Sequence, residues 1–194
     1  MKVYGLTGGI GCGKSTISHI LQNYGYQIID ADSLTHELHK DPDLCRTLAD
    51  IFGPDVITHT QNGPCVNRKN LGQLVFNAPE ARAKLDQIMR PALRNIAMDR
   101  LQHRTAPAIL DAALLFEAGW QDLTDENIVV LCPEQTRCKR IQARNGLSEQ
   151  AAIARIRAQM SDLERIARAD RLIFNTGDMC HLRRQISLIF DISI

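Results

Sequence analysis

The sequence predicts an α/β fold in which a largely parallel sheet carries helices on both faces. Short apolar runs rich in β-branched residues alternate with segments of helical periodicity along the 194 residues. A glycine-rich stretch stands between the first apolar run and the first helical segment. Such alternation is typical of parallel sheets, whose neighbouring strands are joined by helical crossovers.

Five segments are predicted to be strands: VYGLT at 3–7, YQIID at 26–30, AILDA at 108–112, IVVLC at 128–132 and RLIFN at 171–175. The first helix is expected from about residue 13 to 24, stopping at Gly25, which suits a left-handed cap. Capping residues also predict four further helix starts, at Asp41-Pro42, at Asn77-Ala78-Pro79-Glu80, at Ser148 and at Ser161 with Glu164.

The long interval between the second and third strands has a distinct character. Residues 33–107 are expected to be mostly helical, which is far more than one crossover requires. We interpret them as a helical insert that carries substrate selectivity. The chain is therefore expected to be one domain, with a core formed by residues 1–32, 108–136 and 160–194.

Composition excludes several classes of protein. No apolar run approaches the roughly 18 residues that a membrane-spanning helix needs, and the N-terminus does not resemble a signal peptide, so we expect a cytoplasmic protein. The net charge of +1 argues against a surface built to bind nucleic acid. Charge is nevertheless uneven, because residues 137–171 hold nine Lys and Arg against four Asp and Glu.

The stretch GGIGCGKS at 8–15 fits the pattern G-x-x-x-x-G-K-[ST] of a phosphate-binding P-loop. Its glycines allow the backbone to wrap closely around phosphates, while Lys14 supplies a positive charge and the Ser15 hydroxyl a ligand for Mg²⁺. Cys12 is either an oxidisable thiol in a positive environment or a small residue that the loop tolerates, and the second interpretation is favoured. No guanine-reading NKxD motif of the GTPase class occurs.

Two carboxylates close the second predicted strand. Asp30 and Asp32 lie where ligands of open α/β sheets gather, beyond the carboxyl end of the strand. A carboxylate there can accept the proton of an acceptor hydroxyl, and we favour this role for Asp32. The alternative is that these residues cap the following helix, which we favour for Asp30.

A cationic segment follows the fourth predicted strand. Arg137, Arg140 and Arg144 fall on one helix face, where like charges repel unless an anion lies among them. Residues 137–159 are therefore interpreted as a two-helix lid over a bound triphosphate. The alternative is a solvated arginine-rich face.

These stretches together resemble the dephospho-CoA kinases, and the resemblance covers almost the whole chain. The similar stretches are GLTGGIGCGKST at 5–16, IIDAD at 28–32, NRKNLGQLVF at 67–76, LLFE at 114–117, residues 137–159 and ADRLIFNTGD at 169–178. Cys12, Arg90 and Ala113 depart from the family pattern, which usually has Ser, His and Pro at those positions.

The resemblance implies a P-loop kinase fold with strand order 2-3-1-4-5, three sub-regions and the use of ATP with Mg²⁺. It makes Asp32, Lys14 and Arg140 the expected catalytic residues. The nucleotide is expected to contact Gly8, Gly9, Gly11, Cys12, Gly13, Lys14, Ser15, Thr16, Arg140, Asn175 and Gly177, with Ser15 as the metal ligand. The acceptor is expected to contact Asp32, Arg68, Leu71, Phe76 and Glu117, mostly within a CoA-binding insert.

The implied reaction is transfer of the ATP γ-phosphoryl group to the ribose 3′-hydroxyl of dephospho-CoA, the last step of CoA biosynthesis. Two alternatives stay open from the residues alone: a kinase for another small hydroxyl acceptor or a nucleoside monophosphate, and a non-catalytic module that senses ATP. We expect a monomer or a weak homo-oligomer that acts on a small molecule, without a nucleic-acid or membrane partner.

Overall fold

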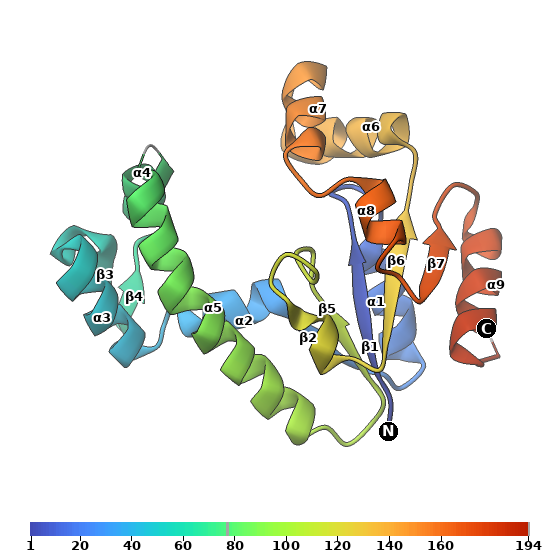
Figure 1. Ribbon diagram of the computed structural model, residues 1–194, viewed down its shortest axis with the longest axis horizontal. Helices are drawn as coiled ribbons and strands as arrows, with labels where there is room; N and C mark the ends of the chain where they lie inside the picture. The colour runs from blue at the N-terminus through green and yellow to red at the C-terminus, as the bar shows by residue number, and fades with distance from the viewer. Residues whose placement is uncertain (77, 194) are drawn as a thin grey trace. The chain divides into compact units, whose positions relative to one another are not determined.

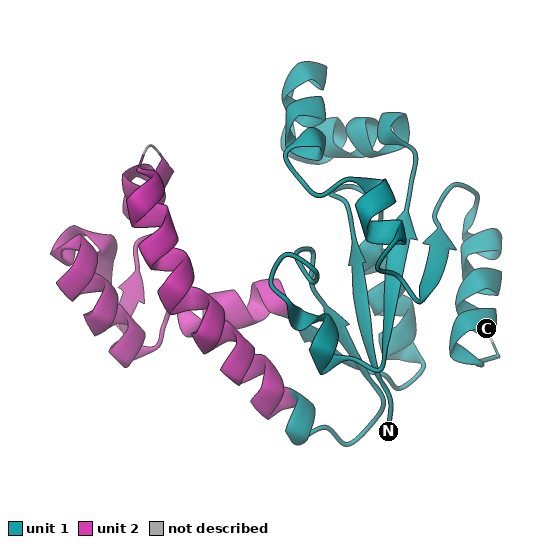
Figure 2. Cartoon of the chain, viewed as in Figure 1, with its two compact units in different colours: residues 1–30, 101–194 teal, residues 31–100 magenta. Residues whose placement is uncertain are grey.

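A five-stranded parallel sheet forms the centre of the first of two units in the computed structural model (Figure 1), which describes residues 1–76 and 78–193. Figure 2 shows the division into unit 1, residues 1–30 and 101–194, and unit 2, residues 31–100. The helices and strands of unit 1 are β1 (Val3–Gly8), α1 (Lys14–Asn23), β2 (Gln27–Asp30), β5 (Ala108–Asp111), η2 (Trp120–Leu123), β6 (Glu126–Leu131), α6 (Glu134–Asn145), α7 (Glu149–Arg157), α8 (Asp162–Ile166), β7 (Arg171–Phe174) and α9 (Met179–Phe190).

The order of the strands in this sheet is β2-β5-β1-β6-β7, and all four pairings are parallel. Counted along the chain, these five strands have the order 2-3-1-4-5, so the predicted topology is confirmed. Residue Leu6 of β1 pairs with Asp111 of β5 and Ile128 of β6, which places β1 in the middle of the sheet. The carboxyl end of β1 therefore lies between two strand ends.

Both faces of the sheet are buried by apolar side chains of the helices and loops that cover them. On one face, Ile17 and Leu21 of α1 and Ile186 of α9 pack with the strands in a single cluster. The rings of Tyr4 and Phe190 meet edge to face with centroids 4.9 Å apart, which ties the end of α9 to β1. The opposite face is covered by the segment after β5, including the buried Trp120 of η2, and by α8.

The predicted helix starts agree with the capping contacts. Asp41 accepts a hydrogen bond from Leu44 N at the start of α3 (Pro42–Phe52), and Ser148 accepts one from Ala151 N at the start of α7. Ser161 and Glu164 form the predicted capping box of α8. The predicted cap at Asn77 lies outside the described residues, and α5 (Pro79–Gln102) begins two residues later.

Unit 2 is mostly helical, as predicted, but it also holds an antiparallel hairpin that the sequence analysis missed. Its elements are α2 (Ala31–Leu38), α3, η1 (Pro54–Val56), β3 (Ile57–Thr60), β4 (Gly63–Val66), α4 (Arg68–Phe76) and most of α5. Strands β3 and β4 form a two-stranded sheet of their own in the described part of the chain. Each has four residues, and β4 contains Pro64, so the strands show too little apolar periodicity to be predicted. Leu48, Val56 and Met89 belong to the separate apolar core of this unit.

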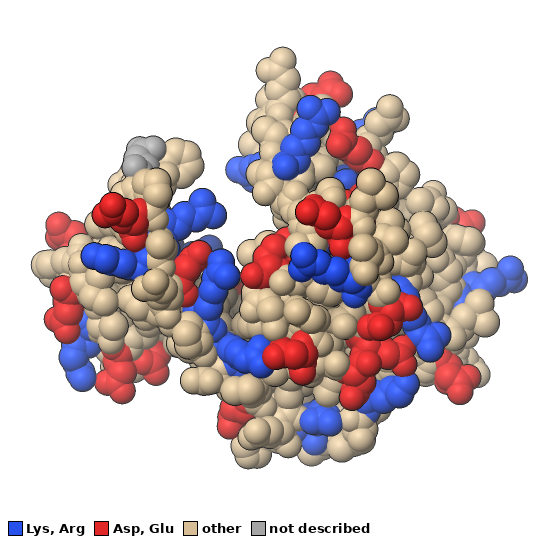
Figure 3. Space-filling model, viewed as in Figure 1, with Lys and Arg blue, Asp and Glu red and all other residues tan. Residues whose placement is uncertain are grey.

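Positive and negative side chains are interspersed on the visible face of unit 1 (Figure 3), which is consistent with the net charge of +1. None of the described helices is both long and apolar enough to cross a bilayer.

We expect Leu48→Ala to destabilise the chain through unit 2. The Leu48 side chain is fully buried, so the truncation leaves a cavity and should lower the free energy of unfolding by about 2–5 kcal/mol. Urea denaturation followed by far-ultraviolet circular dichroism measures the loss. Ile51→Ala on the same helix is the control, because Ile51 is 47% exposed and its truncation should change stability by only about 0.5 kcal/mol. Equal losses in the two variants would contradict the assignment of this core.

Candidate functional site

The predicted P-loop lies between a strand and a helix, as the motif requires. Gly8 ends β1, and Lys14, Ser15 and Thr16 begin α1. Gly11 and Gly13 between them have φ angles of 80° and 92°, a conformation that residues with a Cβ rarely adopt. The bend therefore delivers the N-terminus of α1, with its partial positive charge, to the end of the central strand.

A carboxylate that sequence analysis missed holds the P-loop lysine. Lys14 Nζ forms an ion pair with the side chain of Asp111, which also accepts a hydrogen bond from the Ser18 hydroxyl. Asp111 is 5% exposed and ends β5, the strand that pairs with β1. Its role becomes visible only when β5 is known to neighbour β1, because the sequence shows a single Asp at the end of an apolar run.

Side chains from α6 and from the segment after β7 contact the backbone of the P-loop. Arg140 Nη1 donates to the carbonyl oxygens of Gly11 and Cys12 at 3.2 and 3.3 Å. Asn175 Nδ2 donates to the same Cys12 oxygen at 2.8 Å. A Cβ on Gly13 would overlap Asn175 Nδ2, so glycine is needed there for close approach as well as for torsion. Five residues predicted to bind nucleotide are thus brought together: Gly11, Cys12, Gly13, Arg140 and Asn175.

A pocket of about 380 Å³ adjoins this contact region within unit 1. It is lined by Gly13 and Thr16 of the P-loop end, by Arg140, and by Asn175 and Gly177 with the first residues of α9. All five of these residues were predicted to contact nucleotide. Its size falls in the range of pockets for small molecules, of about 300–1,000 Å³.

Other polar groups lie at the Gly9 side of the loop. The Ile10 amide donates to Gln159 Oε1 at 2.8 Å. Glu117, predicted to contact the acceptor, follows β5, and its Oε1 lies 3.7 Å from Nη2 of Arg165 in α8. Neither Gln159 nor Arg165 was predicted to be a site residue.

The remaining predicted acceptor residues lie in unit 2. Asp32 is in the first turn of α2, and its backbone oxygen is 2.7 Å from His36 Nδ1. Arg68 Nη1 lies 2.8 Å from His36 Nε2, and because a guanidinium only donates, His36 must accept this hydrogen bond. Leu71 is 5% exposed in the unit 2 core, whereas Phe76 at the end of α4 is 85% exposed.

The position of Asp32 bears on the capping alternative. Helix α2 begins at Ala31, so Asp30 directly precedes it and Asp32 lies within it. An N-cap residue stands immediately before the first helical residue. The helix bounds therefore put Asp30 at the N-cap position, while the role of Asp32 toward an acceptor hydroxyl stays a prediction.

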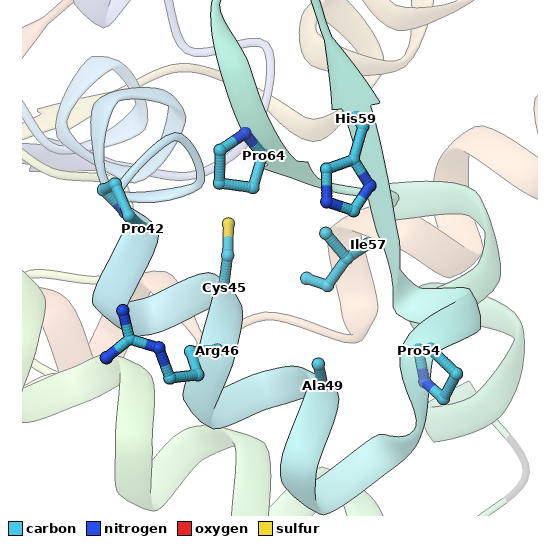
Figure 4. Close-up of a pocket in the computed structure, with 8 residues that line it drawn as sticks. All are labelled: Pro42, Cys45, Arg46, Ala49, Pro54, Ile57, His59 and Pro64. Carbon is cyan, nitrogen blue, oxygen red and sulfur yellow. The ribbon is translucent and has the colours of Figure 1, made fainter.

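A second pocket, of about 280 Å³, lies entirely within unit 2 between α3, η1 and the β3–β4 hairpin (Figure 4). Figure 4 shows the Cys45 side chain directed toward Pro64 of the hairpin. Three prolines and Ile57 contribute to a mainly apolar lining. None of the predicted site residues lines it.

The environment of Cys12 favours its interpretation as a small residue that the loop tolerates over its interpretation as an oxidisable thiol. The side chain is 2% exposed, and loss of solvent raises the pKa of its thiol, outweighing the opposing effects of the Lys14 amide and of the Lys14 and Arg137 charges. A neutral buried thiol is a weak nucleophile. Cys12 is thus a packed residue of the loop.

Comparison with known proteins identifies relatives along almost the full length. The family model described as dephospho-CoA kinase matches residues 2–181. A protein of Carboxydothermus hydrogenoformans named dephospho-CoA kinase is 39% identical over 97% of this chain and 93% of its own length.

Solved structures agree with the sequence relatives. A crystal structure from Thermus thermophilus superposes with a TM-score of 0.82 at 32% identity and covers 98% of this chain and 96% of its own. Dephospho-CoA kinase from Campylobacter jejuni superposes with a TM-score of 0.67 at 27% identity, with the same coverage of both chains.

We expect Cys12 to resist alkylation in the folded protein at neutral pH. Its raised pKa keeps the thiol protonated, and burial excludes the reagent, whereas Cys180 is exposed. Iodoacetamide labelling followed by peptide mass spectrometry should find Cys180 modified well before Cys12, and labelling in urea should remove the difference. Equal rates for the two thiols in the folded protein would refute this description of Cys12.

Proposed function

The chain belongs to the dephospho-CoA kinase family, and we propose that it transfers the γ-phosphoryl group of ATP to the ribose 3′-hydroxyl of dephospho-CoA. The bond between the γ-phosphorus and the β–γ bridging oxygen breaks, and ADP leaves with that oxygen. A new bond forms between phosphorus and the acceptor oxygen, whose proton passes to a carboxylate. The products are coenzyme A and ADP.

One observation carries the nucleotide half of this proposal. The P-loop delivers Lys14 and the N-terminus of α1 to the end of the central strand, beside a pocket lined by Arg140 and Asn175. A triphosphate fits the positive charge of the loop and helix end, and an adenine fits the adjoining pocket. We propose that Lys14 and Arg140 stabilise the charge of the transferring group.

The residues present also fit Mg²⁺. Ser15 offers an exposed hydroxyl at the start of α1, and Asp111 a carboxylate at the end of β5, and such oxygen donors suit a hard cation. Among the residues that the structure describes, no group of three or more His, Cys, Asp or Glu could hold a metal by itself. When bound, Mg²⁺ neutralises charge on the β- and γ-phosphates.

For the acceptor half, we propose that Asp32 orients the 3′-hydroxyl and accepts its proton. Arg68 and Phe76, in α4, and Glu117 are proposed to bind dephospho-CoA, with residues 33–107 as the CoA-binding insert and 137–159 as the lid. The contact of Arg68 with His36, which itself contacts the Asp32 backbone, supports a shared role for these residues. Leu71 would act by supporting α4 from the core.

Two further expectations belong to the same proposal. A small cytosolic metabolite as substrate suits a cytoplasmic enzyme, and a site built from one chain suits a monomer or a weak homo-oligomer. Size-exclusion chromatography with light scattering tests the second expectation.

We expect ADP release to depend on dephospho-CoA. A coupled assay of ADP formation should show strong stimulation by dephospho-CoA, and little by AMP or by coenzyme A, whose 3′-oxygen already carries phosphate. The 3′-deoxy analogue of dephospho-CoA should inhibit without being phosphorylated, because it lacks the attacking oxygen. Stimulation by AMP instead would favour a nucleoside monophosphate kinase, and ATP binding without stimulation by any acceptor would favour an ATP sensor.

We expect Asp32→Asn to fold and bind ATP but to lose turnover. The amide cannot take up the hydroxyl proton, so kcat should fall by about 100-fold or more. Asp43→Asn is a matched control, because Asp43 has an 86% exposed side chain that pairs only loosely with Arg46 in α3. Steady-state kinetics with equilibrium binding of ATP measure both effects, and full activity of Asp32→Asn would refute the role of Asp32.

A further inference from the structure

Two arginines with buried side chains lie against the P-loop at Gly9. Arg137 is in α6 and Arg165 in α8, and their side chains are 7% and 1% exposed. A Cβ on Gly9 would overlap Arg137 Nη1 and would lie 3.6 Å from Arg165 Nη1. Both guanidinium groups therefore approach the backbone of the loop where it lacks a side chain.

The hydrogen bonds of Arg165 are incomplete. Its Nη1 donates to the backbone oxygen of Met160. The carboxylates of Asp162 and Glu117 lie 3.6 and 3.7 Å from its nitrogens, which is ion-pair distance but beyond a hydrogen bond. Within residues 1–76 and 78–193, its buried Nε and Nη2 have no hydrogen-bond acceptor. The Arg165 guanidinium is thus held by the negative charges of Asp162 and Glu117, while two of its nitrogens have no acceptor among the described residues.

Arg137 differs from Arg165 in its partner. Its Nη1 and Nη2 donate to the two carboxylate oxygens of Asp162 at 3.4 and 3.2 Å. Only its buried Nε is without an acceptor in the described part of the chain. Asp162 therefore holds the Arg137 guanidinium beside the loop through two hydrogen bonds. Among the described residues, Arg165 has two buried nitrogens without an acceptor, whereas Arg137 has one.

Buried donors without acceptors are costly, and they are rare in folded proteins unless they serve a ligand or a reaction. The ligand with a matching arrangement of oxygens is a phosphoryl group, which arginine binds with parallel N–H donors. The Nη1 atoms of both guanidinium groups lie beside Gly9, in the loop that the P-loop motif assigns to phosphate. Arg140, by contrast, already donates to loop carbonyls.

We propose that Arg165, supported by Arg137, binds the oxygens of the phosphoryl group during its transfer and is a further catalytic residue of this enzyme. The proposal rests on the function proposed above. Negative charge spreads over the three equatorial oxygens of the transferring group, and a buried cation there acts where water cannot screen it. No bond is made or broken beyond those already written for the transfer.

A competing explanation gives Arg165 only a structural role. In that case it neutralises Glu117 and Asp162, and removing it leaves these two partly exposed carboxylates short of positive charge. The two explanations differ in what happens when the charge is rebalanced. Arg165→Gln/Glu117→Gln removes one charge of each sign, so a structural role predicts recovery in this double variant, whereas a phosphoryl-binding role predicts none.

The test uses two measurements on the full-length protein. The first is kcat with ATP and dephospho-CoA. The second is the affinity for Mg·ADP with and without aluminium fluoride, which mimics the planar transferring group and needs no acceptor. Arg183→Gln on α9 is the control, because this exposed arginine lies outside the proposed site.

We expect Arg165→Gln to lower kcat by about 1,000-fold, while the affinity for Mg·ADP alone stays close to that of the unaltered protein. The gain in affinity from aluminium fluoride should be lost in this variant and in the double variant, but retained in Glu117→Gln. Arg165→Lys should recover at least tenfold of the lost rate, because it restores the charge.

The proposal is overturned if Arg165→Gln keeps its kcat, or if the double variant regains the response to aluminium fluoride. Should Arg165→Gln fail to fold, the charge-balanced double variant compared with Glu117→Gln decides the question. Failure of the proposed function is recognised separately, because the unaltered protein would then release no acceptor-dependent ADP, while its response to aluminium fluoride would still report on Arg165.

Discussion

The ion pair between Lys14 and Asp111 joins the first residue of α1 to the last residue of β5, and the geometry of the site depends on it. Asp111 is buried and also accepts from Ser18, so one carboxylate fixes two residues of the helix. The parallel pairing of β1 with β5 brings this carboxylate to the loop. A lysine held in this way is positioned before any phosphate arrives, which lowers the entropic cost of binding.

Around this fixed lysine, the P-loop is contacted from two directions by groups that are distant in sequence. Arg140 and Asn175 donate to the carbonyl oxygens of Gly11 and Cys12, whereas Arg137 and Arg165 approach Gly9. The first pair satisfies carbonyl oxygens of the loop, and the second pair has donors without acceptors among residues 1–76 and 78–193. The glycines therefore serve a second purpose besides torsional freedom, because they admit the side chains of α6 and α8.

The sequence alone predicted the elements whose signals are local. The five strands of the parallel sheet, the strand-loop-helix context of the P-loop and the caps at Asp41, Ser148 and Ser161 all follow from neighbouring residues. Asp111 and Arg165 could not be predicted. The role of Asp111 arises from strand pairing, and that of Arg165 from the burial of one arginine side chain in a short helix whose other residues are exposed or partly exposed. The β3–β4 hairpin was missed because four-residue strands show too little periodicity. Leu71 was predicted from its match to a family pattern, and only the structure shows that it packs in the apolar core of unit 2.

The distribution of large aromatic side chains decides what an optical experiment on this chain reports. Trp120 and the three tyrosines all lie in unit 1, and the sequence of unit 2 contains neither residue type. Intrinsic emission therefore follows only the sheet-containing unit. A partial opening confined to residues 31–100 would be silent in fluorescence, and a tryptophan introduced into that segment would make the two units spectroscopically distinguishable.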